Sequence, residues 1–293
     1  MKKSKKLITR FIQFFLKKFF INSLYSKYLF YKTKKKFNKS INAHKSHDKF
    51  SENLDKINHF EYKITSQNNE DGIIEFIFKQ IPNNKYFVEI GFGFYEFNTL
   101  NLIKDKWDGK LIDVDVDEAI ALKKNLDYFF PSNKVEVINN KVTKKNIQDL
   151  VYKNAPNNEI DFFSLDIDSN DYWVLKEINL EQIKVICCEY NHWLGNNEKI
   201  TINYDENFIF EDNGVWGASL LAITDLLKIK NFSLIAVESS GTNAFFVNNK
   251  FIDKFEILSP KKSYRSVGRF YNKIKKKEIF QNVKNNYNLL KKV

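Results

Sequence analysis

The sequence predicts an α/β fold in which helices cover a doubly wound, mostly parallel sheet, with a closing antiparallel hairpin and helical, basic extensions at both ends. The first observation behind this prediction is a continuous unit of strand, glycine turn, helix, strand and carboxylate in residues 86–115. The second is that short apolar strands alternate with helical segments as far as residue 190, which is typical of parallel sheets. The third is a pair of strands, residues 232–238 and 243–248, joined by a four-residue turn that contains glycine.

Charge divides the chain into three parts. The net charge is +11, but residues 1–60 hold 16 lysines and arginines against 3 acids and residues 250–293 hold 13 against 3, whereas residues 61–249 hold 18 against 30. We therefore expect a basic amphipathic helix and a linker in residues 1–60, a central α/β domain in residues 61–250, and a basic, helical tail in residues 251–293. The acidic central domain argues against nucleic acid as a partner and confines attraction to anionic surfaces to the two ends.

The N-terminal segment, residues 5–24, has the pattern of an amphipathic helix. One face would carry apolar side chains, namely Ile8, Phe11, Ile12, Phe15 and Phe19. Arg10 and Gln13 interrupt the apolar run, so the segment is too short to span a bilayer, and no small-residue cleavage site follows it. Two interpretations stay open: the helix lies on an anionic inner-leaflet surface, or it packs on the protein's own core. Residues 32–60 show little periodicity and are predicted to form a linker.

The central unit opens with a buried strand, Tyr86–Ile90, which is short, aromatic and β-branched and is ended by a glycine. Gly91 and Gly93 lack side chains where the backbone has to turn tightly, so that a ligand can approach the main chain and the amides of the next helix. Asn98 or Thr99 is expected to cap that helix. The sequence therefore predicts a ligand-binding turn directly after the first strand.

A carboxylate closes this unit. The second strand, Lys110–Val114, contains Asp113, and an ionised carboxylate at the carboxyl end of a strand can accept hydrogen bonds from both hydroxyls of a ribose. Dinucleotide-binding turns have the pattern G-x-G-x-x-G, whereas only Gly91 and Gly93 are present here. Glu89, two positions before the first glycine, instead suits a cofactor that bears a cation, such as S-adenosylmethionine.

Three motifs, VEIGFG at the first strand, LIDVD at the second and IDFFSLDIDSNDYWVLKEI at the fourth, resemble class I S-adenosylmethionine-dependent methyltransferases. Within that class they resemble the FkbM-type group, which often methylates sugar hydroxyls. The resemblance runs from about Ser66 to Val247 and implies a Rossmann-like sheet and S-adenosylmethionine as the cofactor. The sequence departs from the pattern at Tyr95, where a third glycine would stand, and at Ser169, where the group usually has glycine.

Two further parts of the chain are linked to the cofactor by this resemblance. A helix is predicted over residues 73–78, ending before Pro82, and the segment before it resembles one that lies near the cofactor, which implies that place for Gln67 and Asp71. For Asp71, ordinary helix capping is the alternative. After the second strand we predict a helix capped by Asp117 and a third strand, residues 134–138. The resemblance implies that Asn140 contacts the adenine there, although paired asparagines also form simple turns.

A second group of carboxylates follows the fourth strand, Ile160–Leu165. Asp166 and Asp168 stand at its carboxyl end, where open α/β sheets bind ligands, and point to the same side if the strand geometry continues. Two such carboxylates can share a proton, bind a metal or orient a substrate hydroxyl, and we assign no metal site. Asp171 is expected to be the N-cap of the next helix, and capping with loop solvation is the structural alternative for the whole group.

The fifth strand, Lys184–Tyr190, is predicted to bring Glu189 and His192 to the same edge of the sheet. An imidazole there is suited to accept the proton of an acceptor hydroxyl near neutral pH, which makes His192 the candidate general base. The alternative is a histidine that only caps or packs in its loop. Cys187 and Cys188 point to opposite faces of the strand and are expected to be buried, reduced thiols.

Residues 201–213 are irregular, aromatic and acidic and are expected to form a wall of the acceptor pocket. Trp193, Tyr204 and Trp216 have flat apolar faces on which sugars stack, while core packing accounts for most aromatic residues in this chain. The lysine-rich tail after Phe251 is predicted to be helical and either to pack on the N-terminal helix or to contact lipid.

Together these features favour a cytoplasmic S-adenosylmethionine-dependent O-methyltransferase that acts on a hydroxyl of a glycan or a related metabolite, with the inner membrane surface as a candidate peripheral location. The residues expected to bind the cofactor are Glu89, Gly91, Gly93, Asp113, Asn140 and Asp166, and the candidate catalytic residues are Asp168 and His192. Two alternatives stay open, and the oligomeric state is left open as well. A nucleic-acid methyltransferase is disfavoured because no Asn/Asp-Pro-Pro-aromatic arrangement is present, and a non-catalytic, membrane-associated scaffold is suggested by Tyr95 and Ser169.

Overall fold

The computed structural model describes residues 22–48, 54–266 and 272–293, and the amphipathic face expected at residues 8–19 lies outside them. Its helices and strands, in chain order, are α2 (Asn22–Ile41), η1 (Lys56–Phe60), α3 (Glu70–Gln80), β1 (Tyr86–Ile90), α4 (Leu100–Lys104), β2 (Asp108–Asp113), α5 (Val116–Phe129), β3 (Val135–Asn139), α6 (Ile147–Tyr152), η2 (Pro156–Asn158), β4 (Ile160–Leu165), α7 (Asp171–Glu177), β5 (Ile183–Glu189), η3 (His192–Leu194), β6 (Ile200–Ile202), α8 (Leu220–Ile229), β7 (Phe232–Val237), β8 (Asn243–Asn248), η4 (Asn249–Lys254), α9 (Pro260–Ser263), α10 (Lys273–Asn285), η5 (Tyr287–Leu289) and β9 (Leu290–Lys292).

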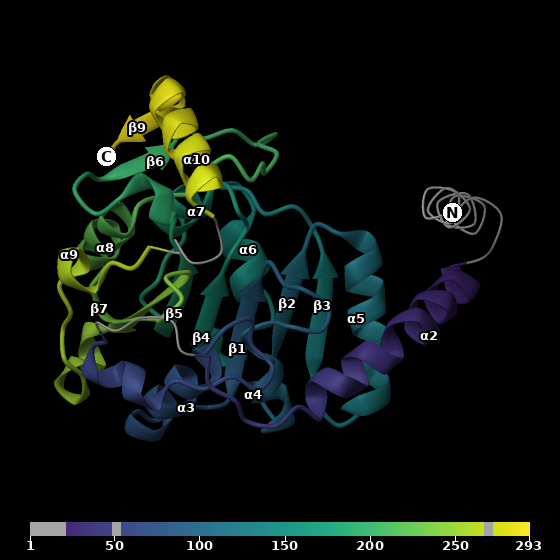
Figure 1. Cartoon of the computed structure of the whole chain (residues 1–293). Helices are drawn as coiled ribbons and strands as arrows, with labels where there is room; N and C mark the ends of the chain where they lie inside the picture. Colours follow the sequence, from purple (N-terminus) through teal and green to yellow (C-terminus); the bar gives the residue numbers. More distant parts are fainter. Residues whose placement is uncertain (1–21, 49–53, 267–271) are drawn as a thin grey trace, which may run out of the picture.

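A seven-stranded sheet forms the centre of the molecule (Figure 1). Its strand order is β3-β2-β1-β4-β5-β8-β7, in which β1 to β5 pair in parallel and β8 pairs antiparallel with both β5 and β7. This confirms the predicted doubly wound sheet and its closing hairpin. From β1 the chain continues to β2 and β3 on one side, and then returns to β4 on the other side of β1. The carboxyl ends of β1 and β4 therefore meet at a switch point, where open α/β sheets bind their ligands.

Two apolar cores cover the faces of the sheet, because successive residues of a strand point to opposite sides. In β1, Val88 belongs to the core formed with α6, α7 and α8, and Phe87 to the core formed with α3, α4 and α5. In β5, Cys188 and Cys187 are divided between the same two cores as buried free thiols, as predicted. Strands buried on both faces carry continuous apolar runs, and such runs were the signal in the sequence.

Helix α2 continues to Ile41, well into the segment that the sequence predicts as a linker. It packs along α5, where Tyr25 and Leu29 are buried together with Ala121, and the Tyr25 hydroxyl donates to Asp117 Oδ2 at 2.7 Å. The linker prediction is wrong for the part of this helix after residue 32. The few apolar residues there are separated by many lysines, so the sequence shows only a weak apolar period. The described part of the N-terminal extension therefore belongs to the folded unit.

Two helices begin differently from the prediction. Helix α5 is capped by Asp115 rather than by Asp117, and the Asp115 carboxylate accepts hydrogen bonds from two backbone N–H groups of the first turn, those of residues 117 and 118. Helix α7 begins at Asp171 itself, with Asn170 as the N-cap residue. The Asp171 carboxylate instead accepts from backbone N–H groups of residues 167 and 169, so that it holds the loop after β4.

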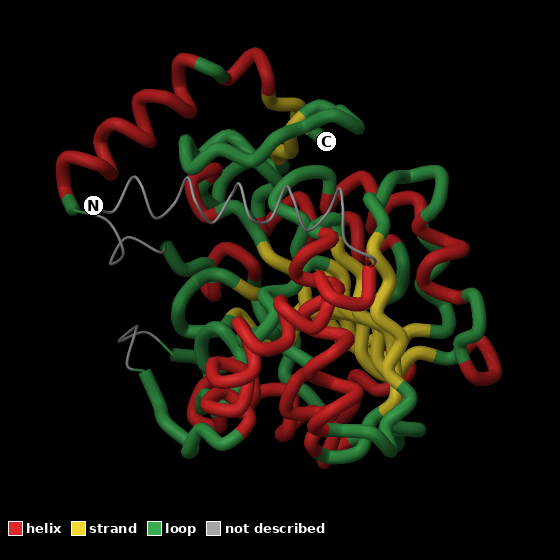
Figure 2. The backbone as a smooth tube through the Cα atoms, turned by 90° about the vertical axis from the view of Figure 1, so that its right-hand side faces the viewer, coloured by secondary structure: helices red, strands yellow, loops and turns green. Residues whose placement is uncertain are grey.

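The C-terminal segment forms a small layer at one end of the sheet (Figure 2). Strand β6 pairs antiparallel with β9, and α10 buries Ile279 and Val283 against Trp193 and Val215. The described tail therefore packs on the segments that follow β5, and not on α2. No helix among the described residues is both long enough and apolar enough to cross a membrane.

Candidate functional site

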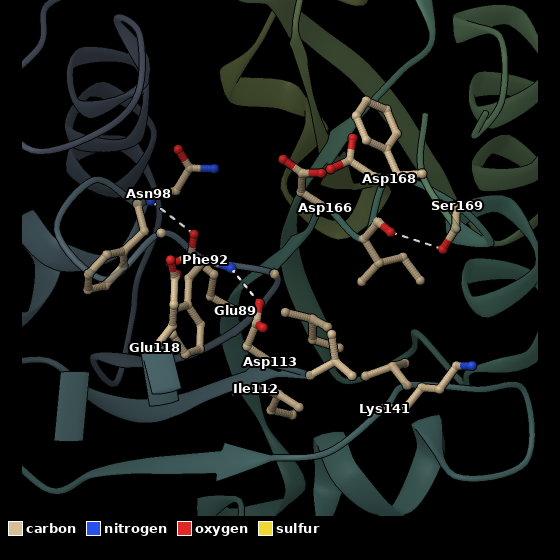
Figure 3. Close-up of a pocket in the computed structure, with 18 of the residues that line it drawn as sticks. Glu89, Phe92, Asn98, Ile112, Asp113, Glu118, Lys141, Asp166, Asp168 and Ser169 are labelled. Atoms are coloured by element: carbon tan, nitrogen blue, oxygen red, sulfur yellow. Dashed lines mark hydrogen bonds between the residues drawn. The ribbon is translucent and has the colours of Figure 1, made fainter. Parts of the chain in front are cut away.

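A cavity of about 720 Å³ opens at the carboxyl ends of β1, β2 and β4 (Figure 3). Its walls come from the turn after β1, the ends of β2 and β4, the loop after β3 and the loop after β6. The predicted site residues that line it are Glu89, Gly91, Gly93, Asp113, Asn140, Asp166 and Asp168. His192 is not among the residues that line this cavity. The structure thus brings most of the predicted residues to one place.

Gly91 allows β1 and β4 to approach each other at this cavity. Its φ is 78°, and a Cβ atom there would lie 1.5 Å from the backbone oxygen of Asp166. The Gly91 N–H donates to the oxygen of Ile112 at 2.9 Å, which ties the turn to β2 as well. Gly93 is less constrained, since a Cβ atom there would lie 3.2 Å from the oxygen of Glu96. Close backbone packing therefore requires the first glycine more strictly than the second.

Glu89 is buried, with 2% of its surface exposed, and it holds the start of α4. Its Oε1 accepts from the Asn98 N–H at 2.9 Å, and its Oε2 accepts from the N–H and the hydroxyl of Thr99 at 2.9 and 2.5 Å. Burial raises the pKa of Glu89 to about 7, although these hydrogen bonds lower it. Glu89, rather than the side chain of Asn98 or Thr99, satisfies the helix start. About one of its four acceptor positions is left for a ligand.

Asp113 ends β2 beside the glycine turn. Its Oδ2 accepts from the Phe92 N–H at 3.2 Å, and its Oδ1 accepts from the Asp115 N–H at 2.6 Å. About two of its four acceptor positions are therefore left for a ligand. Glu118, in the first turn of α5, also lines the cavity. Burial raises the pKa of both carboxyls.

The loop after β3 adds an amide and a lysine to the cavity. Asn140 lines it, and its backbone N–H donates to the oxygen of Asp113 at 2.9 Å. Lys141 is the single lysine or arginine among the described lining residues, against seven carboxylates. Such an excess of negative charge favours a ligand that carries positive charge.

Three carboxylates meet where β4 and β5 end. Figure 3 shows Asp166 and Asp168 pointing toward one another, and each of them and Glu189 offers an oxygen atom within 4.8 Å of the others. Burial, followed by the neighbouring carboxylates, raises the pKa of Asp166 and of Glu189 well above the ordinary range, and burial raises the pKa of Asp168. Carboxylates this close can share a proton or hold a divalent cation. Glu189, which the sequence predicts at the same edge of the sheet, therefore lies with this pair of aspartates.

His192 lies in η3 and is 6% exposed. Its ring is beside Trp193, with centroids 4.6 Å apart, and near Trp216, with centroids 6.5 Å apart. Its Nε2 is buried without a hydrogen-bond partner among the described residues, and burial lowers its pKa to about 4. The Asn191 side-chain amide donates to the backbone oxygen of Trp216 at 2.7 Å. This hydrogen bond holds the segment before His192 against the segment that carries Trp216. The structure therefore places the His192 imidazole among tryptophans and outside the lining of this cavity.

The loop after β6 forms a wall of the cavity, as the sequence predicts. Its contribution is Glu206, Phe208 and Phe210. Trp193 and Trp216, which the sequence marks for stacking, are 3% and 5% exposed and do not line the cavity. An irregular loop has no period, so the sequence carries no signal for which of its aromatic side chains face inward.

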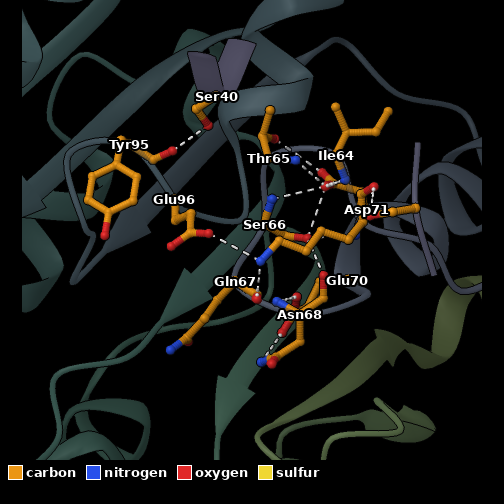
Figure 4. Close-up of polar contacts among 12 residues, drawn as sticks. Ser40, Ile64, Thr65, Ser66, Gln67, Asn68, Glu70, Asp71, Tyr95 and Glu96 are labelled. Atoms are coloured by element: carbon orange, nitrogen blue, oxygen red, sulfur yellow. Dashed lines mark hydrogen bonds and ion pairs between the residues drawn. The ribbon is translucent and has the colours of Figure 1, made fainter. Parts of the chain in front are cut away.

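The segment before α3 reaches the cavity through one residue. Gln67 lines it, whereas Asp71 does not. The Asp71 carboxylate instead accepts from the backbone N–H groups of Ile64, Thr65 and Ser66 (Figure 4). Asp71 thereby holds the loop that presents Gln67, and it does not cap α3, whose N-cap residue is Asn69.

Solved structures similar to this chain have low sequence identity to it. An S-adenosylmethionine-dependent methyltransferase from Clostridium acetobutylicum is 14% identical, with a TM-score of 0.39 over 61% of this chain and 89% of that chain. The N-terminal domain of EvdMO1, solved in the presence of SAH and D-fucose, is 9% identical, with a TM-score of 0.40 over 61% and 82%. A SAM-dependent methyltransferase from Aquifex aeolicus is 15% identical, with a TM-score of 0.36 over 59% and 86%. No family model and no curated protein matches the chain.

Proposed function

We propose that this chain is an S-adenosylmethionine-dependent O-methyltransferase that acts on a hydroxyl group of a glycan or a related metabolite. One observation carries the proposal: the glycine turn after β1, the carboxylate at the end of β2 and the carboxylates after β4 line a single cavity at the switch point of the sheet. A cavity of about 720 Å³ has the size of a small-molecule site.

The chemistry of the lining fits this cofactor. Asp113 has acceptor positions left for a ribose diol, and Asn140 can bond the edge of adenine. The backbone of residues 91–93 would face the methionine part, with Glu89 holding that turn in place and Asp166 beside it. When bound, the cofactor supplies an electrophilic methyl group on a sulfonium cation. The excess of carboxylates over the single ammonium of Lys141 suits that positive charge.

Asp168 is the residue we assign to the proton of the acceptor hydroxyl. It lines the cavity, and its raised pKa makes it a stronger base than an ordinary aspartate. The hydroxyl proton would pass to a carboxylate oxygen of Asp168 as the acceptor oxygen bonds the methyl carbon, whose bond to sulfur would break to leave SAH. Asp168 is preferred to His192 because His192 does not line this cavity.

Other residues that line the cavity offer groups that suit a sugar. Gln67 and Asn170 present amides that can donate to and accept from hydroxyls, and Phe208 and Phe210 present apolar rings. A pocket that combines carboxylates, amides and aromatic faces fits a polyhydroxylated acceptor better than a purely apolar one.

We also assign the protein to the cytoplasm, with its basic ends against an anionic membrane surface. On α10, Lys273, Lys277 and Lys284 are exposed. The buried face of the same helix packs on the protein, so that these lysines are on the side available to a surface.

Thermal unfolding of the purified chain tests the cofactor assignment. S-adenosylmethionine and SAH should each raise the unfolding temperature, whereas NAD at the same concentration should not. A ligand present at about a hundred times its dissociation constant stabilises the folded state by about 2.7 kcal/mol, which is readily measured. No shift with either compound would contradict the proposal, and an equal shift with NAD would point to a dinucleotide site.

Asp113→Asn tests the proposed ribose contact separately from folding stability. The variant keeps the shape of the side chain but loses the charge that strengthens its hydrogen bonds, so affinity for SAH should fall about tenfold or more. The unfolding temperature without ligand should change much less. Calorimetric titration with SAH measures the first quantity, and unchanged affinity would remove Asp113 from the cofactor site.

A further inference from the structure

Helix α2 lies outside the seven-stranded sheet and its covering helices, yet it is anchored along its whole described length (Figure 1). Near its start, Tyr25 is bonded to Asp117 of α5. In its middle, Thr33 is buried and its hydroxyl accepts from the Asn125 amide of α5 at 2.8 Å. Farther along, Phe37 is fully buried in the core that contains α3, α4 and α5. This anchoring positions the last turns of α2 beside the glycine turn of the cavity.

The last turns of α2 contact a residue of the cavity wall directly. The Ser40 hydroxyl donates to the backbone oxygen of Tyr95 at 2.5 Å (Figure 4). The ammonium group of Lys36 lies 3.2 Å from the centre of the Tyr95 ring, a cation–π contact. Tyr95 lines the cavity and stands where the sequence lacks a third glycine. One helix of the extension therefore holds both the backbone and the side chain of this residue.

The opposite side of the same loop is held independently. Lys63 pairs with Glu96 at 3.1 Å and donates to the oxygen of Gln67 at 2.6 Å, and the N–H of Phe97 donates to the oxygen of Thr65 at 3.2 Å. Two outer segments, the end of α2 and residues 63–67, therefore hold the loop of residues 95–97 from two sides. Glu96, Phe97 and Gln67 also line the cavity. Neither of these outer segments is a strand of the seven-stranded sheet.

We infer that α2 is a working part of the cofactor pocket, in which Lys36 and Ser40 are positioning residues that keep Tyr95 and the glycine turn in the conformation that binds S-adenosylmethionine. This inference rests on the proposed function of the cavity. Its consequence is reciprocal: docking of α2 strengthens cofactor binding, and cofactor binding by the same factor strengthens the docking of α2. Burial raises the pKa of Glu118, a second wall residue, and the positive charge of Lys36 partly opposes this rise.

The chain offers a matched pair of variants for the test. Lys36→Gln removes the cation over Tyr95, and Lys34→Gln removes a cation from the same helix that lies 3.7 Å from the ring centre of Tyr128, which does not line the cavity. In calorimetric titrations of the full chain with SAH, Lys36→Gln and Ser40→Ala should each weaken binding about threefold, and the double variant about tenfold. Lys34→Gln should bind SAH as the unmodified chain does.

Amide hydrogen exchange supplies a readout that a merely structural role would not change. Saturating SAH should slow exchange of the backbone amides of residues 36–41 in the unmodified chain, and this protection should be lost in the Lys36→Gln, Ser40→Ala double variant. Equal SAH affinity in the Lys36→Gln and Lys34→Gln variants, or no cofactor-dependent protection of α2, would overturn the inference. If the unmodified chain itself fails to bind SAH, the proposed function fails first and the inference falls with it.

Discussion

Burial raises the pKa values of the carboxylates at the site. The pKa values of Glu89, Asp113, Asp166 and Asp168 are all raised, because a charged carboxylate loses solvation there. Hydrogen bonds from backbone N–H groups oppose this effect at Glu89 and Asp113 without cancelling it. A bound cation, or protons that stay on these carboxyl groups, would offset the cost of burying their negative charge.

Glu89→Gln should change how stability depends on pH. Because the pKa of Glu89 is raised from 4.5 to about 7 on folding, its contribution to stability is fully present below about pH 4.5 and is lost as pH rises through about 7. Glutamine does not titrate, so the unfolding free energy of the original chain should fall relative to the variant by on the order of 3 kcal/mol over this window. Urea unfolding at several pH values measures it, and parallel pH profiles would contradict the raised pKa.

Asp168→Asn should remove turnover while leaving cofactor binding in place. Loss of a positioned base typically costs about a hundredfold or more in rate. The readout is SAH released during incubation with a panel of methyl glycosides, with SAH titration as the control for binding. His192→Gln should keep most of the activity, since this residue is outside the cavity. The opposite result, an inactive His192 variant and an active Asp168 variant, would restore histidine as the base.

At the scale of elements, the turn between β1 and α4 is determined by backbone contacts. Gly91 adopts a positive φ and touches the backbone of Asp166, so that β1 and β4 are joined at the point where the cavity begins. The carboxylate of Glu89 then holds the first turn of α4. A strand end, a glycine and an acid therefore act as one unit, which explains why this short stretch of sequence is so informative.

Two glycine variants separate backbone strain from close packing. Gly91 and Gly195 have similar φ values, 78° and 73°, but a Cβ atom at Gly91 would overlap the Asp166 oxygen, whereas at Gly195 nothing lies within 4 Å. Gly195→Ala should cost roughly 1–3 kcal/mol of stability from its backbone conformation alone, because any residue other than glycine is strained at φ 73° and ψ −167°. Gly91→Ala should cost about 3 kcal/mol or more, because the backbones must move apart. Urea unfolding measures both, and equal losses would show that the approach to β4 is unimportant.

At the scale of the whole molecule, charge is segregated between the ends and the centre. The two terminal segments are strongly basic and the central domain is acidic. Exposed lysines near an anionic bilayer contribute about 1 kcal/mol each, and salt screens them. A surface could thus hold the protein by its ends without entering the acidic cavity.

Vesicle sedimentation tests this arrangement. The full chain should bind vesicles that contain phosphatidylserine at low salt, should be released at high salt, and should not bind neutral phosphatidylcholine vesicles. Replacing the exposed α10 residues Lys273, Lys277 and Lys284 by Gln should weaken binding without changing the unfolding temperature. Binding that is the same with neutral vesicles, or absent with anionic ones, would remove the membrane surface as a partner.

Local sequence pattern was sufficient for the alternating strands and helices of the central sheet and for the place of the cavity. Short apolar runs, glycines after strands and acids at strand ends are read within a few residues, and parallel strands then bring their carboxyl ends to one edge. Glu89, Gly91, Asp113 and Asp168 could be predicted for this reason. Their roles were less predictable, because a carboxylate such as Glu89 can bind either a ligand or a neighbouring backbone.

Contacts between distant segments settled the rest. Tryptophan packing keeps His192 out of the cavity, and helix α2 closes on α5 and Tyr95 although its own period is weak. Neither outcome follows from spacing, since each depends on surfaces contributed by residues far away in the chain. The sequence thus specifies which chemistry stands at the end of each strand, and long-range packing specifies which of those groups share one cavity, because only a folded core can bury a side chain or turn it outward.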